Sequence, residues 1–125
     1  LGKKPYGQMP LYMRAADVLV IPNSAKDDVS SLYTSPMKLF EYMASGTPIV
    51  ASDIHSLREV LNDKNAVFSD PDNPQALADG IKKVLEDKDL SEYVTAEALS
   101  AAKIYTWDKR ADNIISFIKN AHPPR

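Results

Sequence analysis

The strongest constraint on the fold is a short apolar run that ends at a proline. Residues 18–21 read Val-Leu-Val-Ile, and Pro22 follows directly. A run of β-branched and leucine side chains without polar alternation is typical of a strand that is buried on both faces, as in a parallel sheet. Parallel strands need long crossover connections, which are usually helices. The run therefore predicts an α/β domain.

In the rest of the first half, predicted helices and strands alternate, as an α/β domain requires. Helices are expected over residues 10–16 and 35–46, and a second buried strand over residues 48–52. Ser56 is expected to cap a short helix, with Glu59 completing a capping box, before a third strand at residues 66–68. This order predicts part of a Rossmann-like domain, with a short parallel sheet of about three strands flanked by helices.

The second half is predicted to be a helical segment. Apolar residues recur at helical spacing over residues 76–85 and 90–102, and residues 107–119 form a last helix with an isoleucine stripe. The chain opens without Met and reaches an apolar segment almost at once, so we expect a fragment of a larger protein. Residues 1–9 and 121–125 are expected to be frayed.

Composition excludes several classes of function. The net charge of −2 and the lack of a Lys/Arg stripe argue against a nucleic-acid partner. Without cysteine, the chain has no disulfide, no thiolate nucleophile and no zinc-finger spacing. The longest apolar run is too short to span a bilayer. No metal site is expected, because the acidic residues at 86, 87, 89 and 92 lack metal-ligand spacing.

The helix expected over residues 35–46 begins with an unusual cation. Ser35 is a good N-cap and Pro36 suits the first helical position, while Gly46 predicts a left-handed C-cap. Lys38 then lies in the first turn, where a cation is disfavoured by the helix dipole. An anion in front of the helix start would make Lys38 and the first backbone N–H groups favourable.

Two interpretations of Lys38 stay open on the residues alone. It either faces a bound anion, or it is a solvated side chain paired with Glu41 three residues later. The polar loop at residues 23–34 follows the carboxyl end of the first strand, where open parallel sheets bind ligands. The position in the fold therefore favours the anion hypothesis.

The chain resembles a known family over nearly its whole length. The residues that carry the resemblance are the stretches 15–22 (Ala-Ala-Asp-Val-Leu-Val-Ile-Pro) and 35–52, with 72–78 and 105–107 fitting the tail. Together they look like the C-terminal half of family 4 glycosyltransferases, which are retaining enzymes of the two-domain GT-B architecture. The resemblance implies that residues 1–125 are the C-terminal part of a donor-binding domain.

The resemblance also implies a donor site. Glu41 matches the second glutamate of a Glu–seven residues–Glu motif, which hydrogen-bonds the donor ribose; a carboxylate can accept from both hydroxyls of a diol. Backbone amides at Met37 and Lys38, with Leu39 as a third candidate, would hold the diphosphate and the sugar at the helix start that contains Ser35 and Pro36.

The sequence departs from the family pattern eight residues before Glu41. Tyr33 stands where the motif has its first glutamate, which leaves the identity of the sugar open. We interpret the change as altered recognition. Asp27 or Asp28 is an alternative acceptor from the loop, although surface acids are usually solvated.

The implied function is transfer of a sugar, with retention, from a nucleotide-sugar to a glycan, lipid-linked or small-molecule acceptor. The nucleotide-sugar is a substrate and no cofactor is expected. The acceptor, and any contact with the inner face of the membrane, would involve a missing N-terminal domain, and the enzyme would be cytoplasmic. The family's Arg/Lys pair for the diphosphate is also absent, so we expect this chain alone to bind donor weakly and not to turn over.

Two alternatives from other classes remain. One is a non-catalytic α/β scaffold for protein interaction, which Tyr33 favours; the other is a sugar-nucleotide epimerase of the same architecture. Further candidate residues have simpler interpretations. His55 is expected at the surface rather than as a catalytic base, and Asp53 is expected in a turn near the cleft rather than in contact with ligand. Tyr105 and Trp107 are expected to pack in the core rather than stack on sugar.

Overall fold

A parallel sheet with helices around it forms the centre of the molecule. The computed structural model describes residues 2–26, 28, 31–32 and 37–121. The sheet has the order β1 (Leu19–Ile21), β2 (Ile49–Ser52) and β3 (Val67–Ser69), and both strand pairs are parallel. The expected α/β fold with a short three-stranded parallel sheet is confirmed, and each strand lies within one residue of its predicted start.

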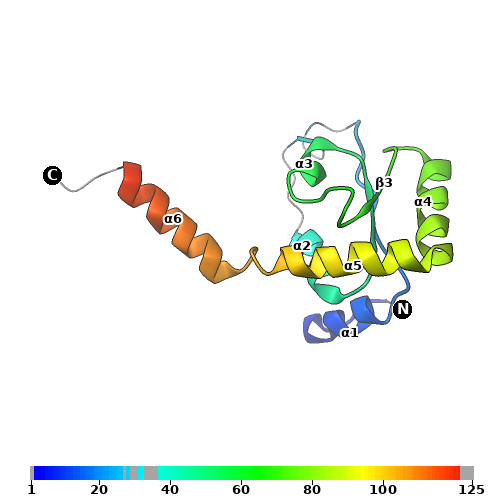
Figure 1. Cartoon of the computed structure of the whole chain (residues 1–125), viewed down its shortest axis with the longest axis horizontal. Helices are drawn as coiled ribbons and strands as arrows, with labels where there is room; N and C mark the ends of the chain where they lie inside the picture. Colours follow the sequence, from blue (N-terminus) through cyan, green and yellow to red (C-terminus); the bar gives the residue numbers. More distant parts are fainter. Residues whose placement is uncertain (1, 27, 29–30, 33–36, 122–125) are drawn as a thin grey trace.

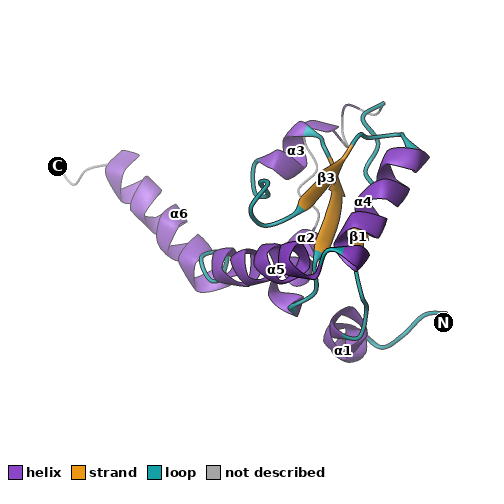
Figure 2. Ribbon diagram, turned by 45° about the vertical axis from the view of Figure 1, so that its right-hand side comes forward, coloured by secondary structure: helices purple, strands orange, loops and turns teal. Residues whose placement is uncertain are grey.

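Helices make up most of the remaining described chain. Figure 2 shows the strands between them, with α4 along one side of the sheet and α5 crossing at its end. The elements are the 3₁₀ helix η1 (Tyr6–Gln8) and the α-helices α1 (Met9–Arg14), α2 (Met37–Ser45), α3 (His55–Arg58), α4 (Pro74–Glu86), α5 (Lys88–Ala102) and α6 (Trp107–Ala121). The segment at residues 1–9, expected to be frayed, thus contains η1 and the first residue of α1, while residues 122–125 lie outside the described residues.

The core lies between the sheet, α2 and α5. All four side chains of β2 are buried. Ile49 and Ala51 belong to one core cluster with the buried side chains of Leu39 and Met43 of α2. On the other side α4 approaches closely at Gly80, where an added Cβ would lie 3.2 Å from Val50 Cγ1. Gly46 ends α2 with a φ of 77°, as its predicted role of left-handed C-cap requires.

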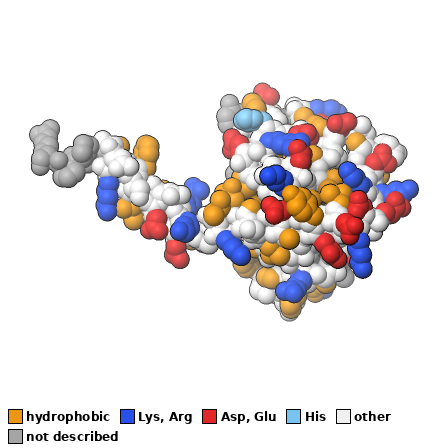
Figure 3. Space-filling view, viewed as in Figure 1, with side chains coloured by type: hydrophobic (Ala, Val, Ile, Leu, Met, Phe, Trp, Pro, Cys, Tyr) orange, Lys and Arg blue, Asp and Glu red, His pale blue; other side chains and the backbone are white. Residues whose placement is uncertain are grey.

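The last helix projects away from this core. Figure 1 shows α6 extending from the body beyond the end of α5. None of its residues is buried, so the predicted isoleucine stripe is present in the sequence but faces solvent. On the face shown in Figure 3, acidic and basic side chains are interspersed over the body of the molecule.

The predicted capping box at Ser56 is wrong. The short helix α3 begins at His55 after Ile54, without a side-chain cap, and Glu59 is its C-cap. The buried side chains of Ile54 and Leu57 set the position of this single turn, and Ser56 is buried with them. Burial of apolar area here outweighs the few tenths to about 2 kcal/mol that an N-cap contributes.

Side-chain caps start α4 and α5. Asn73 Oδ1 accepts from the backbone N–H groups of Gln75 and Ala76 at the start of α4, at 3.1 Å each. Asp87 Oδ1 accepts from Leu90 N–H at 2.9 Å at the start of α5. These bonds satisfy donors that a helix start leaves without intrahelical partners.

Asn73→Ala is expected to lower the free energy of unfolding by about 1 kcal/mol, because it removes both cap bonds. Asn73→Asp keeps a side-chain oxygen at the same place and should stay close to the wild type. Urea unfolding followed by circular dichroism measures both variants. Equal unfolding midpoints for Asn73→Ala and the wild type would show that the cap contributes nothing.

Candidate functional site

Glu41 lies on α2 and shares a hydrogen bond with a residue far away in the sequence. The hydroxyl of Tyr6, on η1, donates to Glu41 Oε1 at 2.8 Å. The side chain of Glu41 is half-buried, whereas Tyr6 is 78% exposed. The hydrogen bond and the negative charge of Glu41 raise the pKa of Tyr6 above its usual value. Sequence reasoning missed Tyr6, since spacing along the chain gives no sign of this contact.

The pair lies at a groove between α2 and α6. The groove has a volume of about 710 Å³, within the ~300–1,000 Å³ usual for small-molecule sites. Its lining is mostly apolar and aromatic, with Glu41 and Arg110 as its charged residues. The lining residues are Tyr6, Met37, Phe40, Glu41, Ala44, Ile104, Tyr105, Thr106, Trp107, Arg110, Asn113 and Ile114.

The expectation that Tyr105 and Trp107 pack in the core is wrong. Tyr105 is 40% exposed and Trp107 is 71% exposed, and both line the groove. Tyr105 contacts the Phe40 ring of α2, with ring centroids 5.1 Å apart. The cause is the direction of α6, which leaves the body just after α5, so that the aromatic residues at the junction border a surface groove.

The start of α2 carries the predicted anion-binding residues Met37 and Lys38, both exposed. Among the residues that the structure describes, Lys38 forms no ion pair with Glu41. The alternative of a simple Lys38–Glu41 pair is therefore not supported. Within the first turn of a helix the N–H groups lack intrahelical acceptors, so this end of α2 offers donors to an anion.

Several residues predicted for the site fall outside the described part of the chain. They are Tyr33, Ser35, Pro36 and Asp27, and their proposed contacts stay predictions. Asp28 is described and exposed.

Hydrogen bonds join the loop after β1 to the loop after β3. Asp72 accepts from Ser24 Oγ at 2.7 Å and from Ala25 N–H at 2.9 Å, and these bonds lower its pKa. Asp72 has a φ of 57°, a left-handed conformation that Asp adopts more readily than most residues. This contact fixes the first part of the loop that leads towards α2. Sequence reasoning missed this contact, because it joins residues 48 positions apart.

Asp53 has a structural partner beside the sheet. Arg58 donates to its two carboxylate oxygens from Nε at 2.7 Å and from Nη2 at 2.8 Å, and to Asp63 from Nη1 at 2.8 Å. The guanidinium also lies 3.5 Å from the centre of the Phe68 ring. These bonds from Arg58 lower the pKa of Asp53. Asp53 therefore anchors the turn after β2, as its interpretation as a turn residue predicted.

This arrangement predicts a pH dependence of stability. A carboxyl group with a lowered pKa stabilises the fold above its unfolded pKa, about 3.9 for Asp, and the contribution is lost as pH falls through the folded pKa. Between pH 7 and pH 3 the free energy of unfolding, measured with urea, should fall further for the wild type than for Asp53→Asn, which lacks the charge. Asp17→Asn, at an exposed position, is the control and should follow the wild type. An identical pH dependence for Asp53→Asn would contradict a stabilising ion pair.

His55 is confirmed as a surface residue. Its side chain is 69% exposed, and Nε2 lies 3.7 Å from Glu59 Oε1 in the next turn. No contact of this pair reaches the groove residues within the described chain, so His55 has no place in the candidate site.

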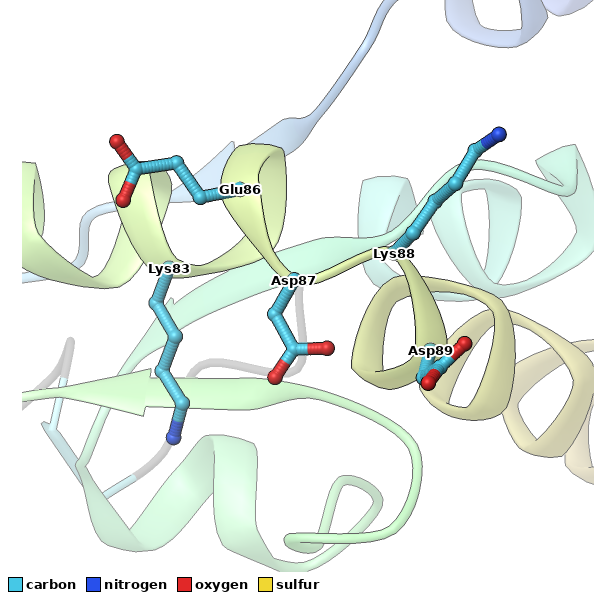
Figure 4. A pocket seen from close by; sticks show the side chains of 5 residues that line it. All are labelled: Lys83, Glu86, Asp87, Lys88 and Asp89. Carbon is cyan, nitrogen blue, oxygen red and sulfur yellow. The ribbon is translucent and has the colours of Figure 1, made fainter.

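The junction of α4 and α5 forms a second, charged depression of about 480 Å³. Figure 4 shows that its side chains do not converge: Lys83 and Asp87 point to one side, whereas Glu86 and Lys88 point away from them. Asp87 already caps α5. In the described ranges no three His, Asp or Glu residues come together as a metal site would need. This depression is a solvated helix junction.

The fold and groove define a Rossmann-like α/β domain with a carboxylate at its candidate ligand site. The family described as "Glycosyl transferases group 1" matches residues 1–101. Phosphatidyl-myo-inositol mannosyltransferase of Mycobacterium tuberculosis is 38% identical over 108 residues, which are 82% of this chain and 27% of that protein. This chain belongs to the group 1 glycosyl transferases.

Solved structures share the fold at low sequence identity. The Anabaena protein Alr3699/HepE, in complex with UDP-glucose, aligns with a TM-score of 0.78 at 20% identity over 96% of this chain and 31% of that one. The C-terminal domain of a glycosyl transferase group 1 protein from Francisella tularensis aligns with a TM-score of 0.64 at 18% identity, over 84% of this chain and 51% of that one. The chain spans less than a third of the curated relatives it matches. None of the described helices is long and apolar enough to cross a membrane.

Proposed function

We propose that this chain is the donor-binding part of a retaining, nucleotide-sugar-dependent glycosyltransferase, from the C-terminal half of a family 4 enzyme with the GT-B architecture. The observation that carries the proposal is the half-buried Glu41 carboxylate, which lies on α2 at the groove and matches the motif glutamate. The Anabaena protein, of the same fold, has been crystallised with UDP-glucose, which supports a nucleotide-sugar as donor.

Glu41 is the proposed ligand of the ribose. An ionised carboxylate accepts through two oxygens, with about four lone-pair sites, and so can bind both hydroxyls of a cis-diol. Between the described residues, Tyr6 occupies one site on Oε1, and Oε2 accepts no hydrogen bond. Capacity therefore remains for two ribose hydroxyls.

The start of α2 is the proposed site of the diphosphate. Lys38 precedes Glu41 by three residues, which places its Cα about 4.5 Å nearer the helix start. The N–H groups of Met37 and Lys38, the helix dipole and the Lys38 ammonium all favour negative charge there. Ribose at Glu41 and diphosphate at the helix start then lie in the order that a nucleotide requires.

Sugar transfer would need parts that this chain does not contain. Lys38 is one cation, and the leaving diphosphate of such a reaction requires strong stabilisation of developing charge. We propose that the acceptor, whether glycan, lipid-linked or small, binds a further domain, that the whole enzyme is cytoplasmic, and that the chain alone binds donor without turnover.

Glu41→Ala is expected to weaken binding of a nucleoside diphosphate by roughly 1.5–3 kcal/mol, the scale for hydrogen bonds to a charged group. Isothermal titration calorimetry with UDP, GDP and ADP measures the change in affinity and shows which nucleobase the site prefers. Glu97→Ala, which removes an exposed acid on α5, is the matched control and should bind like the wild type.

Two results would contradict the proposal. One is an unchanged affinity in Glu41→Ala, which would remove the ribose assignment. The other is the absence of binding of all three diphosphates at millimolar concentration, which would favour a non-catalytic interaction module.

A further inference from the structure

Tyr6 is placed in a way that core packing does not explain. The helix η1 that carries it has no buried residue, and its ring is 78% exposed. A side chain this exposed gains little free energy from burial. Its specific contact among the described residues is the 2.8 Å hydrogen bond to Glu41, and both side chains line the same groove.

This contact constrains the carboxylate at the point where the proposed function needs it. A glutamate side chain has several rotatable bonds, and ordering it on binding costs free energy. A donor on Oε1 limits the carboxylate to orientations that keep the bond, before any ligand arrives. The tyrosine hydroxyl suits this role because it remains protonated, and hence a donor, over the whole neutral range.

We propose that Tyr6 is a positioning residue for Glu41, which holds the carboxylate ready to receive the two ribose hydroxyls of a nucleoside diphosphate. The inference rests on the proposed function. Tyr6 uses one acceptor site on Oε1 and leaves Oε2 open among the described residues, so the phenol and the diol bind Glu41 together rather than in competition. Tyr6 thus acts through Glu41 and makes its contribution only for ligands that carry the diol.

The experiment compares UDP, GDP and ADP with their 2′,3′-dideoxy counterparts in the wild type, Tyr6→Phe, Glu41→Ala and the double variant. Tyr6→Phe keeps the ring and removes the donor. It should weaken binding of the preferred ribonucleotide three- to tenfold and leave its dideoxy counterpart unchanged. In the Glu41→Ala background, Tyr6→Phe should have no further effect. Tyr93→Phe removes another exposed tyrosine hydroxyl, on α5, and is the control.

Other outcomes overturn the proposal in distinguishable ways. Tighter ribonucleotide binding by Tyr6→Phe would show that the phenol competes with the diol. Equal weakening for ribo- and dideoxynucleotides would show a contact with another part of the ligand or a change in the fold. If Glu41→Ala weakens binding of the ribonucleotide but not of its dideoxy counterpart, and Tyr6→Phe weakens neither, the positioning role fails and the proposed function stands. If Glu41→Ala leaves ribonucleotide binding unchanged, or weakens both ligands equally, the ribose assignment of the proposed function itself fails.

Discussion

The pairing of β2 with both of its neighbours is the interaction on which the rest of the structure depends. All four of its side chains are buried, and its two edges hydrogen-bond to β1 and β3. Such a strand must be covered on both faces, which brings α2 to one side and α4 to the other. The absence of a side chain at Gly80 lets α4 approach Val50, and burial of Leu39 and Met43 fixes which face of α2 is left for solvent.

The candidate site follows from that placement of α2. Leu39 and Met43 face the core, so Met37 and Glu41 of the same helix line the groove. There they lie beside the aromatic residues of the α5–α6 junction, Tyr105 and Trp107. The carboxylate is half-buried and already hydrogen-bonded, yet keeps acceptor capacity. A helix that is rigid because of its buried face is well suited to hold a ligand-binding carboxylate on its other face.

Much of the fold was predictable because it depends on local patterns. The apolar runs at residues 18–21 and 48–52 are long enough to identify buried strands, and Gly46 is a C-cap signal that the structure confirms. Glu41 was found through its place in a family motif. The features that the sequence did not predict depend on tertiary packing. The hydrogen bond of Tyr6 joins residues 35 positions apart. Because α6 leaves the body, Tyr105 and Trp107 border a groove rather than fill the core. At α3, burial of Ile54 overrode a capping pattern.

Amide chemical-shift mapping of the isotope-labelled chain with UDP, GDP and ADP tests the central claim most directly, since it locates binding without requiring turnover. A nucleotide that binds through ribose at Glu41 and diphosphate at the start of α2 should shift the amides of Met37, Lys38 and Glu41, together with Tyr6. The α4–α5 depression around Asp87 should stay unchanged. Shifts confined to that depression, or none with any of the three nucleotides at millimolar concentration, would contradict a nucleotide-sugar site on α2.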